Sequence, residues 1–279
     1  MRFTKMHGAG NDYIFLNGFK AGLPEDLRNL ARRISNRRLG VGGDGLIVLE
    51  PDDSADFRMR IFNADGSEAE MCGNGLRCAF KYLHDRSLVS GDRGVARTGA
   101  GLLDVSIVRR TASADIIRVN MGPPQPGPGP DYIRCVTDDA LRLPLRVEDR
   151  MFEVAFVSVG NPHIVLFLDE AVESFPVEHH GPLLEHHPVF PDRTNVDFVQ
   201  YVGRNEVIQR TWERGSGETH ACGTGACATL VAGSRIGRLE SPTTVHFRGG
   251  DLTVTWQGGV HPVFLEGPAE EVYSGEWNG

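Results

Sequence analysis

The chain has 279 residues and a formal net charge of −8, and its 29 lysine and arginine residues are scattered. This length fits one large domain or two ordinary ones, and the acidic balance argues against nucleic acid as a partner. No window approaches the roughly 20 apolar residues that cross a bilayer, and the first residues form no apolar signal-like run. We therefore expect a cytoplasmic protein with no membrane partner.

The first half of the chain predicts strands and two helices. Strands are expected over residues 2–7, 13–16, 46–49, 57–62, 102–108 and 116–121. A helix is expected over residues 24–38, because Pro24 suits its first position and Leu27, Leu30 and Ile34 share one face. The apolar stretch 76–84 predicts a second helix, which we expect to be buried.

The order of elements then repeats. Five prolines between Gly122 and Pro130 exclude a helix or a central strand and indicate a crossing between two halves. Beyond them, strands are expected over residues 151–159, 164–168, 195–201, 206–212, 243–247, 252–256 and 260–265, with helices at 176–187 and 226–236. The predicted fold class is α+β, with mostly antiparallel strands wrapped around one apolar helix in each half.

Two motifs of the form Glu-x-x-x-Cys-Gly-x-Gly support this duplication. One runs from Glu68 to Gly75 and the other from Glu218 to Gly225, so that Cys72 and Cys222 are 150 residues apart. We interpret the chain as two copies of one unit, each with one cysteine at an equivalent place. A pseudo-two-fold axis between the copies would bring the two cysteines face to face in one active site.

A Cys-Gly-x-Gly motif at the start of a helix suits acid–base chemistry. Free N–H groups there attract anions and are expected to lower the pKa of the cysteine. Two such starts would hold a carboxylate between them, with one thiol on each face of its α-carbon. One thiolate would remove a proton and the opposite thiol would return another, which is the chemistry of a two-base racemase that needs no cofactor.

The other thiols and the histidines are expected to be structural. The chain has five cysteines, which should be free in a reducing compartment: Cys72, Cys78, Cys135, Cys222 and Cys227. Their spacings are poor for zinc, so no metal site is expected. The pairs His179–His180 and His186–His187 are expected to be exposed. A pyridoxal phosphate enzyme is disfavoured, because the three lysines have no phosphate-binding context.

Several segments resemble the diaminopimelate epimerase family, whose members interconvert LL- and meso-diaminopimelate without a cofactor in lysine and peptidoglycan synthesis. The resemblance covers most of the chain, and the two cysteine motifs together are highly specific. The matching segments are 5–12 (KMHGAGND), 63–67 (NADGS), 71–75 (MCGNG), 160–163 (GNPH), 194–196 (TNV) and 213–225 (ERGSGETHACGTG).

The resemblance implies two strand-rich domains, each a barrel around a central helix: residues 1–121 with about 267–279, and residues 122–266. The last strand, near Val272, would return to the first domain. A homodimer is implied, with a small molecule, diaminopimelate, as the other partner.

The resemblance also assigns roles to residues. Cys72 and Cys222 would be the catalytic acid–base pair, and the amides of Gly73, Asn74, Gly223 and Thr224 would hold the reacting carboxylate. His163 and Glu213 would tune the thiol pKa values. The substrate would be bound by these side chains: Asn11, Asn63, Asn161, Asn195, Glu213 and Arg214. Two positions depart from common family members, Gly45 where some carry glutamine and His220 where a neutral residue is common.

Two other functions stay open at this stage. A proline racemase shares the two-cysteine logic, but it favours histidine where this chain has Asn74 and has no need of Glu213 and Arg214. A duplicated amino-acid binding module would have the cleft without the chemistry, although such a module rarely needs paired thiols.

Overall fold

A computed structural model describes residues 1–20, 22–111, 114–125, 132–134 and 139–279. The chain divides into two compact units, Met1–Asn120 with Glu266–Gly279, and Met121–Leu265. Cys135 and most of the proline-rich segment lie outside the described residues. Within the described ranges, no helix combines the length and the apolar character needed to cross a membrane.

The first unit is a closed barrel of eight strands. Its strands are β1 (Arg2–Gly8), β2 (Asn11–Asn17), β3 (Gly45–Glu50), β4 (Phe57–Asn63), β6 (Arg93–Thr98), β7 (Gly101–Arg110), β8 (Asp115–Asn120) and β17 (Val263–Glu276). Each pairs with the next, and β17 closes the ring by pairing with both β8 and β1. The short β5 (Glu68–Ala69) pairs with β4.

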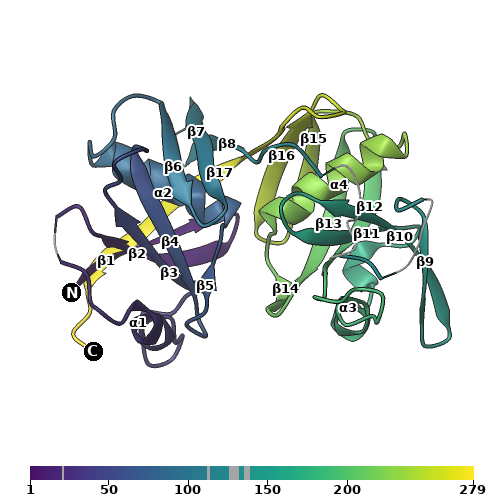
Figure 1. Cartoon of the computed structure of the whole chain (residues 1–279), viewed down its shortest axis with the longest axis horizontal. Helices are drawn as coiled ribbons and strands as arrows, with labels where there is room; N and C mark the ends of the chain where they lie inside the picture. The colour runs from purple at the N-terminus through teal and green to yellow at the C-terminus, as the bar shows by residue number, and fades with distance from the viewer. Residues whose placement is uncertain (21, 112–113, 126–131, 135–138) are drawn as a thin grey trace. The chain divides into compact units, whose positions relative to one another are not determined.

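Two helices cover opposite sides of this barrel wall (Figure 1). Helix α2 (Gly73–Asp85) packs inside against β1, β2, β3, β7 and β8, and its apolar residues Leu76, Phe80 and Leu83 are fully buried. Helix α1 (Leu27–Ile34) packs on β3 and β4, where its apolar face contacts a cluster that includes Val48 and Phe62. An apolar helix inside a ring of strands confirms the fold that the sequence predicts.

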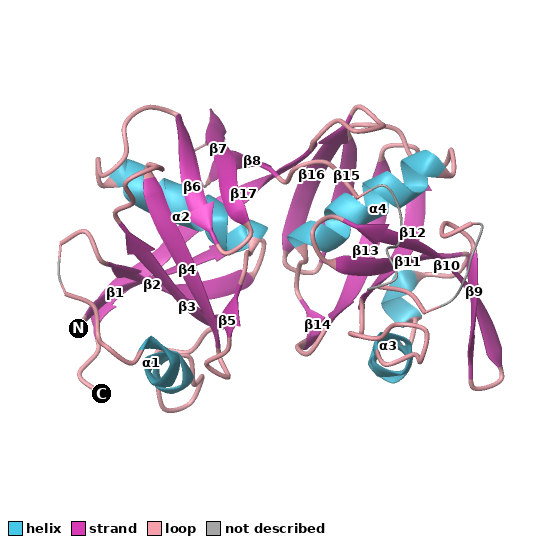
Figure 2. Ribbon diagram, viewed as in Figure 1, coloured by secondary structure: helices cyan, strands magenta, loops and turns pink. Residues whose placement is uncertain are grey.

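The second unit repeats this arrangement (Figure 2). Its strands are β9 (Leu143–Val147), β10 (Arg150–Ser158), β11 (Pro162–Leu168), β12 (Asn195–Gly203), β13 (Glu206–Glu213), β14 (Gly217–Thr219), β15 (Thr243–Phe247) and β16 (Gly250–Trp256). Helix α4 (Gly223–Arg235) packs against β10, β11, β12 and β16, and its face from Ala226 to Gly233 is buried. Outside lie the 3-10 turn Val172–Ser174 and helix α3 (Val177–Glu185), which contacts β12 and β13.

The strand register shows that the repeat is structural. In the first unit β2 and β3 are parallel, with Tyr13 opposite Gly45. In the second unit β11 and β12 are parallel, with His163 opposite Asn195. These two pairs have the same 150-residue offset as the two cysteines. Equivalent positions in the two units can therefore be compared residue by residue.

Several predicted boundaries are wrong. The first helix is shorter than 24–38, because Asp26 caps it by accepting from the Asn29 N–H and the chain leaves the helix at Ser35. Both internal helices begin earlier than predicted, directly after a cysteine. Strands β6 and β9 were not predicted. Strand β17 begins in the second unit and continues to Glu276, so the predicted strand end at residue 265 is wrong, whereas the strand expected near Val272 is present and pairs with β1 of the first unit.

A buried arginine, Arg210 of β13, links the 3-10 turn to strand β14 of the second unit. The Arg210 guanidinium donates to both Glu218 oxygens, at 2.6 and 2.8 Å, and also to the Phe175 carbonyl at 2.8 Å. Only 7% of the Arg210 side chain is exposed. We expect Arg210→Met to lower the free energy of unfolding by about 2–3 kcal/mol, since the Phe175 carbonyl would lose its buried donor and Glu218 would keep only the half-exposed Arg248, at 3.1 Å. Urea unfolding measures this loss.

Arg204→Met is the matched control for this prediction. Arg204 pairs with Glu240 at 3.1 Å, but 73% of its side chain is exposed. An exposed pair contributes about 0–1 kcal/mol, so this variant should unfold nearly as the parent does. Equal losses in the two variants would contradict the role assigned to the buried pair.

Candidate active site

Each candidate catalytic cysteine is the N-cap residue of its internal helix. Cys72 precedes α2 and Cys222 precedes α4, and each is in an extended backbone conformation. Each sulfur accepts a hydrogen bond from the amide three residues later, Gly75 or Gly225, in both cases at 3.4 Å. In each unit the sulfur therefore accepts from one N–H group of the first helical turn, as an N-cap side chain does.

In the first unit, Cys72 lies among polar groups from β2 and α2. Its sulfur is 3.3 Å from Asn11 Oδ1 and receives a hydrogen bond from the Tyr13 hydroxyl at 3.6 Å. Asn74 Nδ2 donates to the same Asn11 oxygen at 3.3 Å. The structure thus brings together three of the residues predicted for this site, Asn11, Cys72 and Asn74.

Asn63 is held at the end of β4. Its side chain donates to Ser67 Oγ at 3.0 Å, within the turn that follows the strand. Asn63 lies opposite Gly45 on β3. A Cβ atom at position 45 would overlap the Phe62 carbonyl oxygen, so this backbone accommodates glycine and not a larger residue. The departure at Gly45 therefore fits the local packing of β3 against β4.

In the second unit, Cys222 lies beside residues of α4, of β11 and of the bend that precedes β11. Its sulfur is 3.5 Å from Thr224 Oγ1, which receives a hydrogen bond from Asn161 Nδ2 at 3.3 Å. His163 Nε2 lies 3.0 Å from the same hydroxyl oxygen. The predicted residues Asn161, His163, Cys222 and Thr224 are thus within one hydrogen-bonded group.

Burial raises the pKa of the Cys222 thiol well above its ordinary value, and the carboxylates of Glu213 and Asp197 act in the same direction. The contacts of the sulfur with the Thr224 hydroxyl and the Gly225 N–H oppose this rise but do not cancel it. The prediction that a helix start lowers the pKa is therefore wrong for Cys222. The cause is desolvation, since only 5% of the residue is exposed and a charged sulfur there loses its contact with water.

Asn195, Glu213 and Arg214 lie where β12 begins and β13 ends. Asn195 donates to the Pro162 carbonyl at 2.8 Å and accepts from the Arg214 amide at 3.0 Å. The Arg214 guanidinium is exposed and donates to the Asp192 carbonyl at 3.1 Å. Glu213 accepts from the Thr219 hydroxyl at 2.5 Å. Asn195 therefore orients the backbone that carries Arg214.

The remaining described cysteines are structural, as predicted. Cys78 and Cys227 are buried within α2 and α4. Burial raises the pKa of Cys78 to about 12. A neutral, buried thiol of this kind packs as a small apolar group.

One histidine expected to be exposed is buried. The His180 ring packs against Phe152 and Phe175, with ring centroids 5.2 and 5.3 Å away. His179 is exposed and pairs with Glu148 at 3.0 Å. Although Glu148, His179 and His180 place ligand atoms within 4.8 Å of one another, the Arg150 cation lies over the same two aromatic rings and opposes a second cation.

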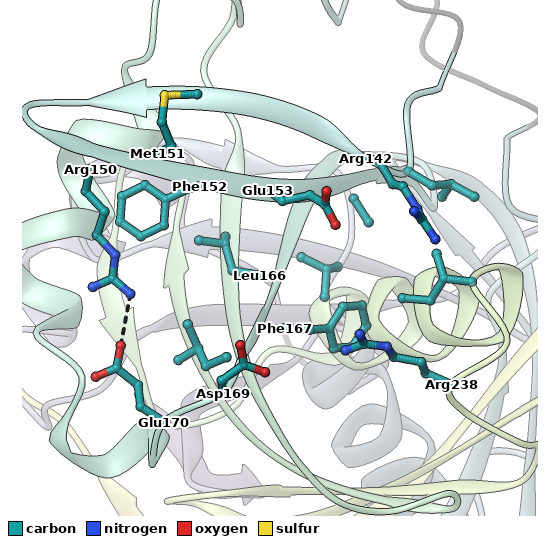
Figure 3. A pocket seen from close by; sticks show the side chains of 15 residues that line it. Arg142, Arg150, Met151, Phe152, Glu153, Leu166, Phe167, Asp169, Glu170 and Arg238 are labelled. Atoms are coloured by element: carbon teal, nitrogen blue, oxygen red, sulfur yellow. Dashed lines mark hydrogen bonds and ion pairs between the residues drawn. The ribbon is translucent and has the colours of Figure 1, made fainter.

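A separate cavity of about 450 Å³ lies in the second unit, where β10 leaves β11 (Figure 3). These strands pair only from Ala155 to Ser158, because the beginning of β10 pairs with β9 instead. In Figure 3 the Arg150 and Glu170 side chains pair at 2.9 Å beside this opening. Neither Cys72 nor Cys222 lines this cavity, so it is not part of the candidate active site.

The fold and the cysteine positions define a class. A hydroxyproline epimerase from Agrobacterium vitis has a similar solved structure, with a TM-score of 0.73 and 18% identity, covering 99% of this chain and 91% of that one. At this identity the likeness concerns the fold alone. The chain therefore has the fold of an amino-acid epimerase, and a cysteine caps the internal helix of each of its two strand-rich units.

The sequence comparisons narrow this class to one family. The diaminopimelate epimerase family model matches residues 3–126 and 155–272. Diaminopimelate epimerase from Desulforudis audaxviator is 47% identical over 280 residues, and that from Pelotomaculum thermopropionicum 46% over 278; each alignment covers 99% of both chains. The chain belongs to the diaminopimelate epimerase family.

Proposed function

We propose that the protein interconverts LL- and meso-2,6-diaminopimelate by moving a proton at one α-carbon, a step in the supply of lysine and peptidoglycan precursors. Family membership supports this substrate. The observation that carries the mechanism is the equivalence of Cys72 and Cys222, each of which caps the internal helix of its own unit. Two equivalent thiols suit a reaction that removes a proton from one face and adds one to the other.

In this mechanism one cysteine enters as a thiolate and the other as a thiol. The thiolate takes the α-proton, so that the C–H bond breaks and its electron pair passes into the adjoining carboxylate. The opposite thiol then gives its proton to the other face of the carbon. Burial keeps Cys222 protonated, so Cys222 is the donor when Cys72 removes the proton.

The amides of the two helix starts are proposed to hold the reacting carboxylate. These are Gly73 and Asn74 at α2, and Gly223 and Thr224 at α4. The first N–H groups of a helix have no partner inside the helix and carry partial positive charge. They would stabilise the negative charge that develops on the carboxylate oxygens during proton removal.

Polar residues at the strand ends are proposed to bind the distal amino-acid group. Arg214 can donate two parallel hydrogen bonds to a carboxylate, and Glu213 can accept from an ammonium group. Asparagine side chains can both donate to a carboxylate and accept from an ammonium group. The asparagines proposed to bind the substrate are Asn11, Asn63, Asn161 and Asn195. Because Arg214 is exposed while its amide is fixed by Asn195, its guanidinium can turn towards a substrate.

No cofactor is proposed for this reaction. Lys5 is buried in an ion pair with Asp12 at 2.5 Å, and Lys81 pairs with Asp115 at 2.9 Å. Two of the three lysines are thus engaged as cations, whereas a Schiff base requires a neutral amine. We further propose a homodimer in the cytoplasm, where free thiols stay reduced. The exposed apolar residues Val272 and Tyr273 on β17 are candidates for the dimer contact.

The direct test is to incubate the purified protein with LL-diaminopimelate, without added cofactor and with a metal chelator, and to separate the isomers by chiral chromatography. We expect meso-diaminopimelate to accumulate up to the equilibrium mixture. Parallel incubation with L-proline tests the proline racemase alternative. Turnover of proline but not of diaminopimelate would favour that alternative, and binding without turnover would favour a binding module.

A further inference from the structure

A buried polar chain crosses the interior of the second unit. Asp197 on β12 is fully buried, and its Oδ1 accepts hydrogen bonds from Gln209 Nε2 and Thr211 Oγ1, each at 2.8 Å. Gln209 in turn accepts from Thr229 of α4 at 2.8 Å. Two neutral donors, Gln209 and Thr211, thus bind one oxygen of a fully buried carboxylate, and Thr229 holds Gln209 in place.

The other end of Asp197 leads to the candidate catalytic sulfur. Asp197 Oδ2 lies 2.8 Å from His163 Nδ1, and both side chains are fully buried. His163 Nε2 lies 3.0 Å from Thr224 Oγ1, which lies 3.5 Å from Cys222 Sγ. An uninterrupted series of hydrogen-bonding groups therefore joins Asp197 to Cys222.

The first unit has an apolar interior at the equivalent places. At the 150-residue offset, Ile47, Met59 and Ile61 stand where the second unit has Asp197, Gln209 and Thr211. All three are buried. The positions also agree in space: a Cβ atom on Gly75 would lie 2.6 Å from Ile47 Cδ1, and a Cβ atom on Gly225 would overlap Asp197 Oδ1.

The first unit shows that this fold forms with an apolar residue at the position of Asp197. Burying a carboxylate costs free energy that an apolar residue of similar size does not cost. The first unit builds the same parallel strand pair and the same buried helix with isoleucine in that place. The fold of such a unit therefore does not require a carboxylate at this place, which points to a chemical role for Asp197 near Cys222.

We propose that Asp197 is a positioning residue that fixes His163 so that Thr224 and His163 can take up the Cys222 proton and return it. The inference rests on the proposed function, because it concerns how Cys222 becomes the base. By accepting from Nδ1–H, the carboxylate leaves Nε2 as an acceptor for the Thr224 hydroxyl. Thr224 Oγ1 is then free to accept from the Cys222 thiol while it also accepts from Asn161.

The proton balance of this transfer is complete. The Cys222 S–H bond breaks and its proton joins Thr224 Oγ1, while the original hydroxyl proton of Thr224 passes to His163 Nε2. The products are a thiolate and an imidazolium, and Asp197 stabilises the imidazolium by its charge. The reverse transfer restores the thiol.

The hydrogen-bonded groups from Asp197 to Thr224 explain how the buried Cys222 can lose its proton. Cys222 must act as a base in one direction of the reaction, although desolvation favours its protonated form. The carboxylates that face it, Glu213 from β13 and Asp197 from β12, also oppose a thiolate. A proton held on His163 places a positive charge near the sulfur and offsets both effects.

Asp197→Asn tests the proposal, because asparagine keeps the size of the side chain but presents an NH₂ group to His163. The imidazole would then carry its proton on Nε2 and could no longer accept from Thr224. We expect kcat to fall by about 100-fold or more, as general acid–base steps contribute about 10²–10⁴, while KM changes less than about threefold. The rising limb of the kcat pH profile should move to higher pH, because losing the His163 acceptor outweighs losing the Asp197 charge, which alone opposes a Cys222 thiolate.

Nitrogen-15 NMR of the His163 ring gives a readout that does not depend on turnover. The unmodified protein should show the Nδ1–H tautomer, and Asp197→Asn should show Nε2–H. Glu185→Gln is the matched control, because Glu185 is another buried carboxylate of this unit that accepts from Trp212 Nε1 at 2.8 Å. This control should leave the His163 tautomer and the pH profile unchanged.

Defined outcomes would overturn the proposal. An Nε2–H tautomer in the unmodified protein would do so, even if Asp197→Asn failed to fold. So would a folded Asp197→Asn protein with kcat within threefold of the parent. A protein that shows the expected tautomers but does not turn over diaminopimelate would contradict the proposed function and leave the positioning of His163 by Asp197 supported.

Discussion

Alanine at position 72 or 222 is expected to abolish net epimerisation, with a loss of at least about 10⁴-fold, since each face of the α-carbon needs its own acid–base group. Serine at either position should leave only traces, because a hydroxyl is a far weaker acid than a thiol. Chiral chromatography of diaminopimelate measures both effects. Cys78→Ala and Cys227→Ala are matched controls, since these cysteines are buried in the same two helices and should be dispensable for turnover.

Heavy water distinguishes the two-base mechanism from a single-base one. Starting from pure LL-substrate, the first product should carry deuterium at the inverted carbon, while recovered substrate stays largely protiated. A single base would return part of the original hydrogen to the product. Retention of most activity by Cys72→Ala would show that the two-thiol mechanism is wrong for this protein.

Arg214→Met is expected to lower kcat/KM for diaminopimelate by about 100-fold, mostly through a higher KM. A charge-assisted hydrogen bond contributes about 1.5–3 kcal/mol, and a two-pronged contact with a carboxylate can use two of them. Steady-state kinetics with the LL isomer measures the loss. Methionine replaces the apolar stem of the arginine side chain and removes only the guanidinium, so the packing of the stem is largely preserved.

Arg204→Met supplies the comparison for this variant. Arg204 is an exposed arginine of the same unit and pairs with Glu240 on the surface. Its loss should leave kcat/KM within about twofold. If Arg214→Met behaved in the same way, Arg214 would have to be removed from the substrate-binding group.

The duplicated architecture can be predicted from the amino-acid sequence. A repeated Cys-Gly-x-Gly motif at one offset identifies the two helix starts, because glycines after a cysteine leave the first amides open to its sulfur. The apolar stretches that follow have little polar surface, so they had to be wrapped by strands. Helix ends were predicted less well, since capping by Asp26 or Cys72 depends on a backbone bend that periodicity does not encode.

The environment of each sulfur depends on residues that are distant in the sequence and meet only in the folded chain. Asp197 and His163 are 34 residues apart, and they meet because β11 and β12 pair side by side in parallel. A single aspartate in a buried strand gives no periodic signal, so Asp197 cannot be identified from the sequence alone. Tertiary packing also determines that the pKa of Cys222 is raised and not lowered. A helix start favours a thiolate wherever it occurs, but desolvation depends on what the rest of the barrel places around it.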